Sequence, residues 1–356
     1  MDHSADMATT PPLDEIDHAL LAELEQQLPL DHRPFERLGR KLDLPEQECL
    51  RRVERLKERQ AIREIRAHFD PTLLGYQTTL VAMCLPARRL QEAAALLGRH
   101  PGVAFVCERN DPFNLWWSLA LPPYESLDQA INALHAATNS QDTVVLPALR
   151  IYKRPPDSLI QRSAHPEEEL EEFAGEAGRT TASPSWSAQD VAFIRVLQED
   201  LPLIEMPFAV LAEQSGAHED ALFEWMKQAQ HRGILRRFAA GVPPRDTPAA
   251  STLVVWQVPA ERVDGVAEAM SSVRAVVRCQ RHPVYASWPY SLSTVMHAGG
   301  TAECAQVIRG IEERIGRLAH KTLITIKEYG RKRLRYFSPE LAHWWQQVEQ
   351  AGPGAE

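Results

Sequence analysis

Two related stretches of the 356-residue chain gather arginine, aromatic and histidine side chains that could bind a ligand and move a proton. The first, residues 107–117, reads CERNDPFNLWW, and the second, residues 279–297, reads CQRHPVYASWPYSLSTVMH. Each carries an arginine near its start, Arg109 and Arg281, and the second alone ends in a histidine, His297. Arginine suits bidentate pairing with carboxylates, and aromatic rings suit a flat apolar surface. Both arginines fall at predicted strand ends beside a loop, where ligand sites concentrate, although surface ion pairs would also account for them.

His297 is the strongest candidate for proton transfer. Histidine titrates near neutral pH, and a well-placed general acid typically contributes about 10²–10⁴-fold to a rate. Strand alternation puts Ser293, Val295 and His297 on one face, and the counterpart of His297 in the first stretch is Ala120. A histidine present in only one stretch favours a unique site. The plainer alternative is a strand-end histidine that bonds to solvent or to a backbone carbonyl.

These stretches belong to two copies of one design. Residues 27–30 and 34–35 (QLPL and PF) reappear at 200–203 and 207–208 (DLPL and PF), an offset of 173. With one gap, Cys107-Glu108-Arg109 aligns with Cys279-Gln280-Arg281. The chain therefore reads as a tandem duplication, and the segment between Arg281 and Tyr290 reads as a five-residue insertion relative to copy one.

The elements that must position these residues repeat in the same order in both copies. Each copy opens with three helical patterns and a short strand, which is typical of a winged helix-turn-helix. A strand-helix-strand-strand-helix-strand order follows, with strands at 78–85, 104–109, 114–121 and 143–152 in copy one and at 252–258, 275–281, 291–296 and 322–329 in copy two. This is the ferredoxin-like βαββαβ order of an α+β fold, in which helices cover one face of each sheet. The open face usually pairs with another sheet, and the second copy supplies one.

The predicted organisation has six parts. They are a first winged helix-turn-helix (13–67), a ferredoxin-like domain (72–154), an acidic linker (155–186), a second winged helix-turn-helix (187–240), a second ferredoxin-like domain (249–337) and a C-terminal tail (338–356).

Composition narrows the class of protein. The net charge is −9, of which residues 155–188 hold −5, so the folded copies are nearly neutral. No apolar run reaches the roughly 18 residues of a membrane span, and the N-terminus lacks the pattern of a signal peptide. Five cysteines without a CxxC pair indicate a reducing, cytoplasmic location.

The combination of winged helix and ferredoxin-like domain resembles the AsnC/Lrp transcription regulators. A DNA reader needs basic and amide side chains at the start of its recognition helix. Residues 45–48 read PEQE and residues 218–220 read HED, and such carboxylates would face phosphates. DNA binding by a small-molecule-responsive regulator therefore stays the alternative, and a DNA partner is not expected.

The two site motifs carry a sharper resemblance. Residues 109–117 (RNDPFNLWW) resemble the first-subunit motif of the siroheme decarboxylases, and residues 288–297 (WPYSLSTVMH) resemble their second-subunit motif. Residues 327–337 (KEYGRKRLRYF) resemble that family's basic-aromatic C-terminal run. Asp111-Pro112 stands where the family often carries a histidine.

The resemblance implies a fused two-subunit carboxy-lyase of haem d1 or haem biosynthesis that removes the C12 and C18 acetate carboxyls of siroheme. His297 would be the acid or an axial ligand of the substrate iron. The identity of a second proton donor stays open, with His282 our weaker candidate. The implied substrate-binding residues are Arg109, Arg281, Arg278, Asn114, Trp116, Trp288, Tyr290, Arg150, Lys153, Arg331 and Lys332. Trp117 is a further candidate for the wall of the site. No cofactor is expected beyond the iron carried by the tetrapyrrole. A tetrapyrrole sensor without catalysis, one or two working sites, and a homodimer of the fused chain all stay open.

Overall fold

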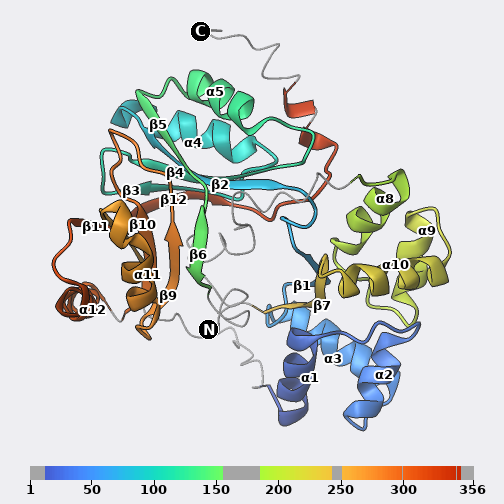
Figure 1. The fold of residues 1–356 in the computed structure, drawn as a ribbon. Helices are drawn as coiled ribbons and strands as arrows, with labels where there is room; N and C mark the ends of the chain where they lie inside the picture. Colours follow the sequence, from blue (N-terminus) through green and yellow to red (C-terminus); the bar gives the residue numbers. More distant parts are fainter. Residues whose placement is uncertain (1–12, 155–184, 243–250, 299, 342, 346–356) are drawn as a thin grey trace, which may run out of the picture.

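The computed structural model describes residues 13–154, 185–242, 251–298, 300–341 and 343–345. Two helix-turn-helix units lie side by side at one end of the molecule, and two sheets with their covering helices form the rest (Figure 1). The predicted linker therefore lies almost wholly outside the described residues. Among the described residues no helix is long and apolar enough to cross a membrane.

The helix-turn-helix units pair through their wings. The first contains α1 (Glu15–Gln26), α2 (Pro34–Lys41), α3 (Glu46–Glu58) and β1 (Glu64–Phe69), and the second contains α8 (Ala188–Leu197), α9 (Pro207–Gln214), α10 (Glu219–His231) and β7 (Leu235–Gly241). Strands β1 and β7 are antiparallel. The Leu28 amide donates to the Phe238 carbonyl at 2.7 Å, and the Leu201 amide donates to the Ile65 carbonyl at 2.8 Å. Because each bond repeats the other at an offset of 173, the two units are related by a pseudo-twofold axis.

Helix starts follow local chemistry. The Asp14 and Ser187 side chains cap α1 and α8, each in a reciprocal capping box with the aspartate three residues later. Proline occupies the first turn of α2 and α9, where its missing N–H costs nothing. One apolar core joins both units, so they form a single body.

Each sheet has five antiparallel strands. The first has the order β12-β3-β4-β2-β5 and the second β11-β8-β10-β9-β6. In copy one the strands are β2 (Gln77–Cys84), β3 (Phe105–Arg109), β4 (Leu115–Leu121), β5 (Asp142–Leu146) and β6 (Arg150–Lys153); in copy two they are β8 (Ser251–Trp256), β9 (Val276–Arg281), β10 (Leu292–His297), β11 (His320–Leu323) and β12 (Thr325–Arg331). Short 3₁₀ turns (Ala87–Arg89, Ala260–Arg262) precede α4 (Leu90–Arg99) and α11 (Val263–Ser271), which cover the outer faces with α5 (Leu127–Thr138) and α12 (Thr301–Ile315).

The last strand of each copy differs from the single continuous strand that the sequence predicts. Copy one breaks at residues 147–149, and its second piece, β6, pairs with β9 of copy two. Copy two breaks at Ile324, and β12 pairs with β3 of copy one. Strand-forming residues follow both breaks, although Pro147 lies in the first one and cannot donate to a strand ladder. Each copy therefore completes the sheet of the other.

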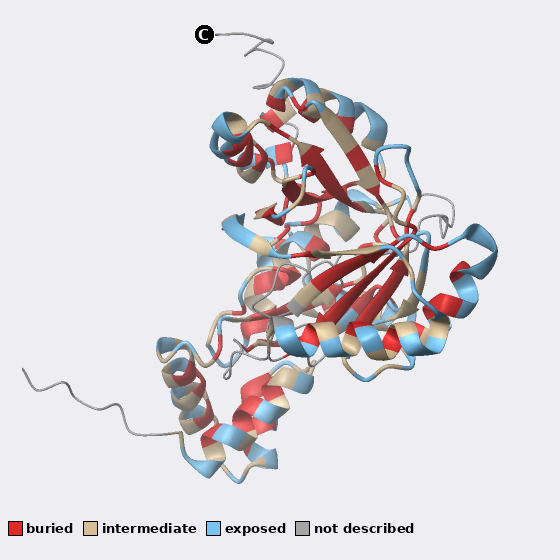
Figure 2. Cartoon of the chain, turned by 90° about the vertical axis from the view of Figure 1, so that its left-hand side faces the viewer, coloured by how far each residue is buried: buried red, intermediate tan, exposed pale blue. Residues whose placement is uncertain are grey.

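The inner faces of the two sheets pack on each other. Their shared core takes Phe105, Trp116 and Leu146 from one sheet and Trp288 and Val295 from the other, among other residues. The strands are predominantly buried and the outer helix faces exposed (Figure 2). The expected pairing of open sheet faces within one chain is thus confirmed.

The predicted C-terminal tail (338–356) also differs in its described part. Leu341 and Trp344 are buried in the core between sheet one and its helices. Tyr336 and Phe337, just before them, enter the helix-turn-helix core. Residues 332–341 therefore connect the two bodies of the molecule.

Candidate active site between the two copies

The aromatic residues of the two sequence motifs contact one another, and they do so inside the protein core. The Trp288 ring lies 5.5 Å from that of Trp116, 5.4 Å from that of Phe113 and 4.9 Å from that of Tyr290, measured between centroids. Arg109 lies 5.3 Å over Trp116 and donates to the Leu323 carbonyl at 3.2 Å. Trp116 and Trp288 are 0% and 1% exposed. These residues pack the two sheets against each other. Trp117 instead packs on the outer face of sheet one, beneath α4 and α5.

A lysine that the sequence did not single out completes this cluster. Lys321 forms a 2.5 Å ion pair with Asp111 and lies 5.4 Å from the Tyr290 ring. Burial acts to lower the pKa of Lys321, but the hydrogen bond and charge of Asp111 outweigh it, so the pKa is raised. Asp111 thus has a structural partner on β11. The two residues are 210 positions apart in the sequence, so sequence spacing does not predict their pairing.

His282 is unsuited to deliver a proton. Its Nδ1 lies 3.1 Å and 3.0 Å from the carbonyl oxygens of Leu146 and Pro147, so Nδ1 carries the hydrogen. Its Nε2 lies 2.8 Å from the Ser293 hydroxyl and accepts from it. Burial lowers the pKa of His282 to about 4. The geometry therefore argues against the prediction that His282 is a second donor, and makes it a neutral structural histidine.

The register also changes the repeat alignment. The Arg109 amide donates to the Asn114 carbonyl just before β4, and the His282 amide donates to the Ser291 carbonyl just before β10. Arg109 therefore corresponds to His282, not to Arg281. The matching CxR letters suggested a gap that the backbone does not have. The real length difference lies in the loops, residues 110–114 and 283–291.

These loops clamp the strand crossings. Asn110 accepts from the Ile324 amide at 2.6 Å, and the Tyr285 hydroxyl donates to the Val145 carbonyl at 2.7 Å. Asn114 bonds to both the amide and the carbonyl of Leu85. The sequence motifs thus hold the exchanged strands in place, a structural role that residue types alone did not reveal.

His297 and Arg278 share the inner face of sheet two. Leu292 and Met296 belong to the outer core, so the alternate residues Ser293, Val295 and His297 face the other sheet. Arg278 pairs with Val295 across the strands and therefore points the same way. Arg278 is 2% exposed, whereas His297 is only partly buried at the end of β10. His297 lies at the end of β10 away from the aromatic loop, whereas Arg278 lies mid-strand, opposite Val295, which packs in the same inner core as Trp288.

The remaining predicted cations lie elsewhere. Arg150 binds Asp264 of α11 at 2.9 Å, and Arg281 pairs with Leu292 on the outer face of sheet two. Lys153 donates to the Val273 carbonyl at 3.0 Å. At sheet one, Arg331 pairs with Glu328 and Lys332 donates to the Gly98 carbonyl at 2.9 Å. The structure does not bring these residues together with His297.

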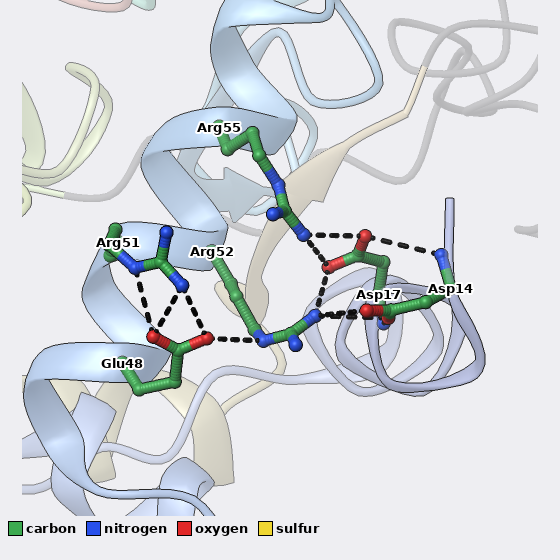
Figure 3. Close-up of polar contacts among 6 residues, drawn as sticks. All are labelled: Asp14, Asp17, Glu48, Arg51, Arg52 and Arg55. Carbon is green, nitrogen blue, oxygen red and sulfur yellow. Dashed lines mark hydrogen bonds and ion pairs between the residues drawn. The ribbon is translucent and has the colours of Figure 1, made fainter. Parts of the chain in front are cut away.

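The arginines of α3 form ion pairs with carboxylates of the helix-turn-helix unit. On α3, Arg51 and Arg52 both bind Glu48, and Arg52 and Arg55 bind the carboxylates of α1 (Figure 3). Asp17, which receives both Arg52 and Arg55, is 1% exposed. The hydrogen bond from Arg52 lowers the pKa of Asp14, and that from Arg51 lowers the pKa of Glu48. The three arginines of α3 are therefore each paired with carboxylates of the protein itself.

Fold and site define a class: a fused, asymmetric pair of AsnC/Lrp-like units whose second copy alone carries a histidine at the end of the inner strand. Comparison with known proteins supports this. Residues 17–63 and 190–236 match the family model for the siroheme decarboxylase NirDL-like HTH domain, and residues 73–153 and 249–330 match the AsnC-like ligand binding domain.

Individual relatives agree. The chain is 27% identical to a siroheme decarboxylase of Hydrogenobacter thermophilus over 92% of this chain and 97% of the relative. Its similarity to the siroheme decarboxylase alpha subunit of Nitratidesulfovibrio vulgaris is 33% identity over 42% of this chain and 85% of that subunit. The crystal structure of the siroheme decarboxylase NirDL superposes with a TM-score of 0.75 at 24% identity, covering 94% of this chain and 99% of that one. The chain belongs to the siroheme decarboxylase family.

Proposed function

We propose that the chain is a siroheme decarboxylase that converts the C12 and C18 acetates of siroheme to methyl groups. Family membership carries this proposal, because the relatives named above are siroheme decarboxylases and one was crystallised in co-complex with an iron-uroporphyrin III analogue. The carboxylates that pair with the arginines of α3 disfavour the regulator alternative. The free cysteines, none of which is in a disulfide, support a cytoplasmic location.

The reaction needs an anion-binding group and a proton donor. The bond between the carboxylate carbon and the acetate methylene breaks, CO₂ leaves, and the electron pair stays on the methylene carbon, from which it spreads into the conjugated ring. One proton then completes the methyl group. No oxidant is consumed, and no cofactor is required beyond the iron that the substrate carries.

We assign the proton to His297 and the carboxylate contact to Arg278. Arg278 is desolvated, which strengthens a charge-assisted hydrogen bond to a carboxylate, and His297 is accessible enough to exchange its proton with solvent. Axial ligation of the substrate iron is the other role open to His297. Pairing of two fused chains stays a prediction.

Anaerobic incubation with siroheme tests the function. We expect a Soret shift on binding and release of two CO₂ per tetrapyrrole. A protein that binds siroheme without loss of mass would be a sensor. Steeply salt-dependent, nanomolar binding to an operator, without uptake of siroheme, would instead support the regulator.

A further inference from the structure

The helix-turn-helix body and the two sheets have little direct contact. In the described part of the chain, no helix or strand of the helix-turn-helix body packs extensively on a helix or strand of either sheet, and the body lies to one side of them (Figure 1). A cleft of about 470 Å³ lies between Glu64, Glu199 and Asp200 of the helix-turn-helix body and Pro101 beside sheet one. The C-terminal segment that crosses this cleft therefore decides how the two bodies sit on each other.

Residues 332–337, which we call the strap, bind sheet one through alternate side chains. The Lys332 amide donates to the Ala104 carbonyl at 2.7 Å, and its side chain donates to a carbonyl in the last turn of α4 at 2.9 Å. Leu334 is buried against Ala104 and Ala120. Successive side chains of an extended chain point to opposite sides, so the arginines between and after these residues face away from sheet one.

Those two arginines bind the helix-turn-helix body. Arg333 and Arg335 both form ion pairs with Glu199, at 3.1 Å and 3.2 Å, and Arg333 also pairs with Glu64. Glu64 begins β1 of the first helix-turn-helix unit and Glu199 follows α8 of the second, so the strap binds both units. The four side chains are between 22% and 52% exposed, and salt therefore screens these ion pairs.

The end of the strap is fixed by bonds that salt does not weaken. Tyr336 and Phe337 are buried in the helix-turn-helix core. The Gln198 side chain accepts from the Tyr336 amide at 2.7 Å and donates to its carbonyl at 3.0 Å, and Arg195 donates to the Phe337 carbonyl at 2.7 Å. Apolar burial is not screened by salt, so this end stays attached when the ion pairs weaken.

The charges of the cleft favour a contact between the bodies over a ligand site. Three cations and four carboxylates line it, so they nearly balance. The two arginines are already paired with carboxylates of the protein, and an ionic ligand would have to break those pairs.

We propose that the strap is a salt-sensitive hinge between the helix-turn-helix body and sheet one. Lys332 at one end and Tyr336 and Phe337 at the other are its fixed points, and the ion pairs of Arg333 and Arg335 hold the cleft at its described width. When those pairs are screened or removed, the helix-turn-helix body turns away from sheet one while both ends of the strap stay bound. The hinge does not rest on the proposed function, so its failure would leave the siroheme chemistry untouched.

Small-angle X-ray scattering of the full chain tests the hinge. Between about 0.1 M and about 1 M salt the Debye length falls from about 10 Å to about 3 Å, so the radius of gyration of the wild type should rise. Arg333→Ala/Arg335→Ala should have the larger radius at both salt concentrations, whereas Arg333→Lys/Arg335→Lys keeps the charges and should behave as the wild type does. The matched control is Arg37→Ala/Arg40→Ala, which removes two ion pairs within the first helix-turn-helix unit and should keep the wild-type radius.

An unchanged radius of gyration, either in the wild type on raising the salt or in Arg333→Ala/Arg335→Ala at low salt, would overturn the hinge. Hydrogen exchange tests its fixed points, because the bonds of the Lys332 and Tyr336 amides do not involve the two arginines. Both amides should stay protected in the alanine variant, and loss of protection would mean that the strap detaches instead of turning, which would also overturn the proposal. The salt comparison uses unaltered protein and does not depend on how well a variant folds.

Discussion

The imidazole of His282 and the hydroxyl of Ser293 lie 2.8 Å apart on neighbouring strands of sheet two, with Nε2 as the acceptor. The other ring nitrogen donates to the carbonyls at the β5–β6 crossing. His282 therefore links the β5–β6 crossing of copy one to strand β10 of copy two through hydrogen bonds. The bond from Ser293 requires that the imidazole be neutral, because only then is Nε2 free to accept.

Stability should fall as the pH drops through the window between the pKa of an unfolded histidine, 6.5, and the folded value of about 4. In that window the unfolded chain binds a proton that the folded chain does not bind. The free energy of unfolding therefore falls by up to about 1.4 kcal/mol for each pH unit. Urea unfolding at pH 7 and pH 5 measures the effect. His282→Gln should reduce the pH dependence, while the exposed His231→Gln should leave it unchanged; parallel curves for all three proteins would refute this role.

The ion-pair network of α3 predicts unequal effects of two neighbouring arginines. Arg52→Ala removes one of the two cations that bind the buried Asp17, so we expect a loss of about 1–3 kcal/mol in the free energy of unfolding. Arg51→Ala removes only an exposed pair with Glu48, so its loss should stay below about 1 kcal/mol. Urea titration compares them, and equal losses would contradict the structural role assigned to the network.

The exchanged strands predict that the two halves need each other. We expect residues 1–170 and 171–356, co-expressed as separate chains, to purify as a 1:1 complex, because β6 and β12 each complete the sheet of the other half and β1 pairs with β7. Light scattering after size-exclusion chromatography gives the mass. Two stable, soluble monomers that do not associate would contradict the described pairing.

The sequence predicted the duplicated fold because the apolar periodicity and the offset of 173 carry it directly. It did not predict the strand exchange, since the residues of β6 and β12 favour an extended strand without indicating which sheet that strand joins. It also misaligned Arg109 with Arg281, because matching letters outweighed a register that only the hydrogen bonds of β4 and β10 reveal.

The candidate site was predictable only in part. The correspondence of His297 with Ala120 follows from strand spacing, and the structure bears it out. A motif of aromatic residues and arginines has the same sequence pattern whether it lines a pocket or fills a core. In the structure Trp116 and Trp288 are fully buried in the core. Lys321 was missed because its partner Asp111 lies 210 residues away.

The most direct test of the central assignment is anaerobic turnover of siroheme by His297→Ala, followed by mass spectrometry. The control is His320→Ala, which removes a partly buried histidine from β11 of the same sheet, where its ring lies at a tilt against Trp256 of the outer core. If His297 is the proton donor, its variant should still bind siroheme while turnover falls about 10²–10⁴-fold, and the control should keep wild-type turnover. Undiminished release of both CO₂ molecules by His297→Ala would contradict the assignment.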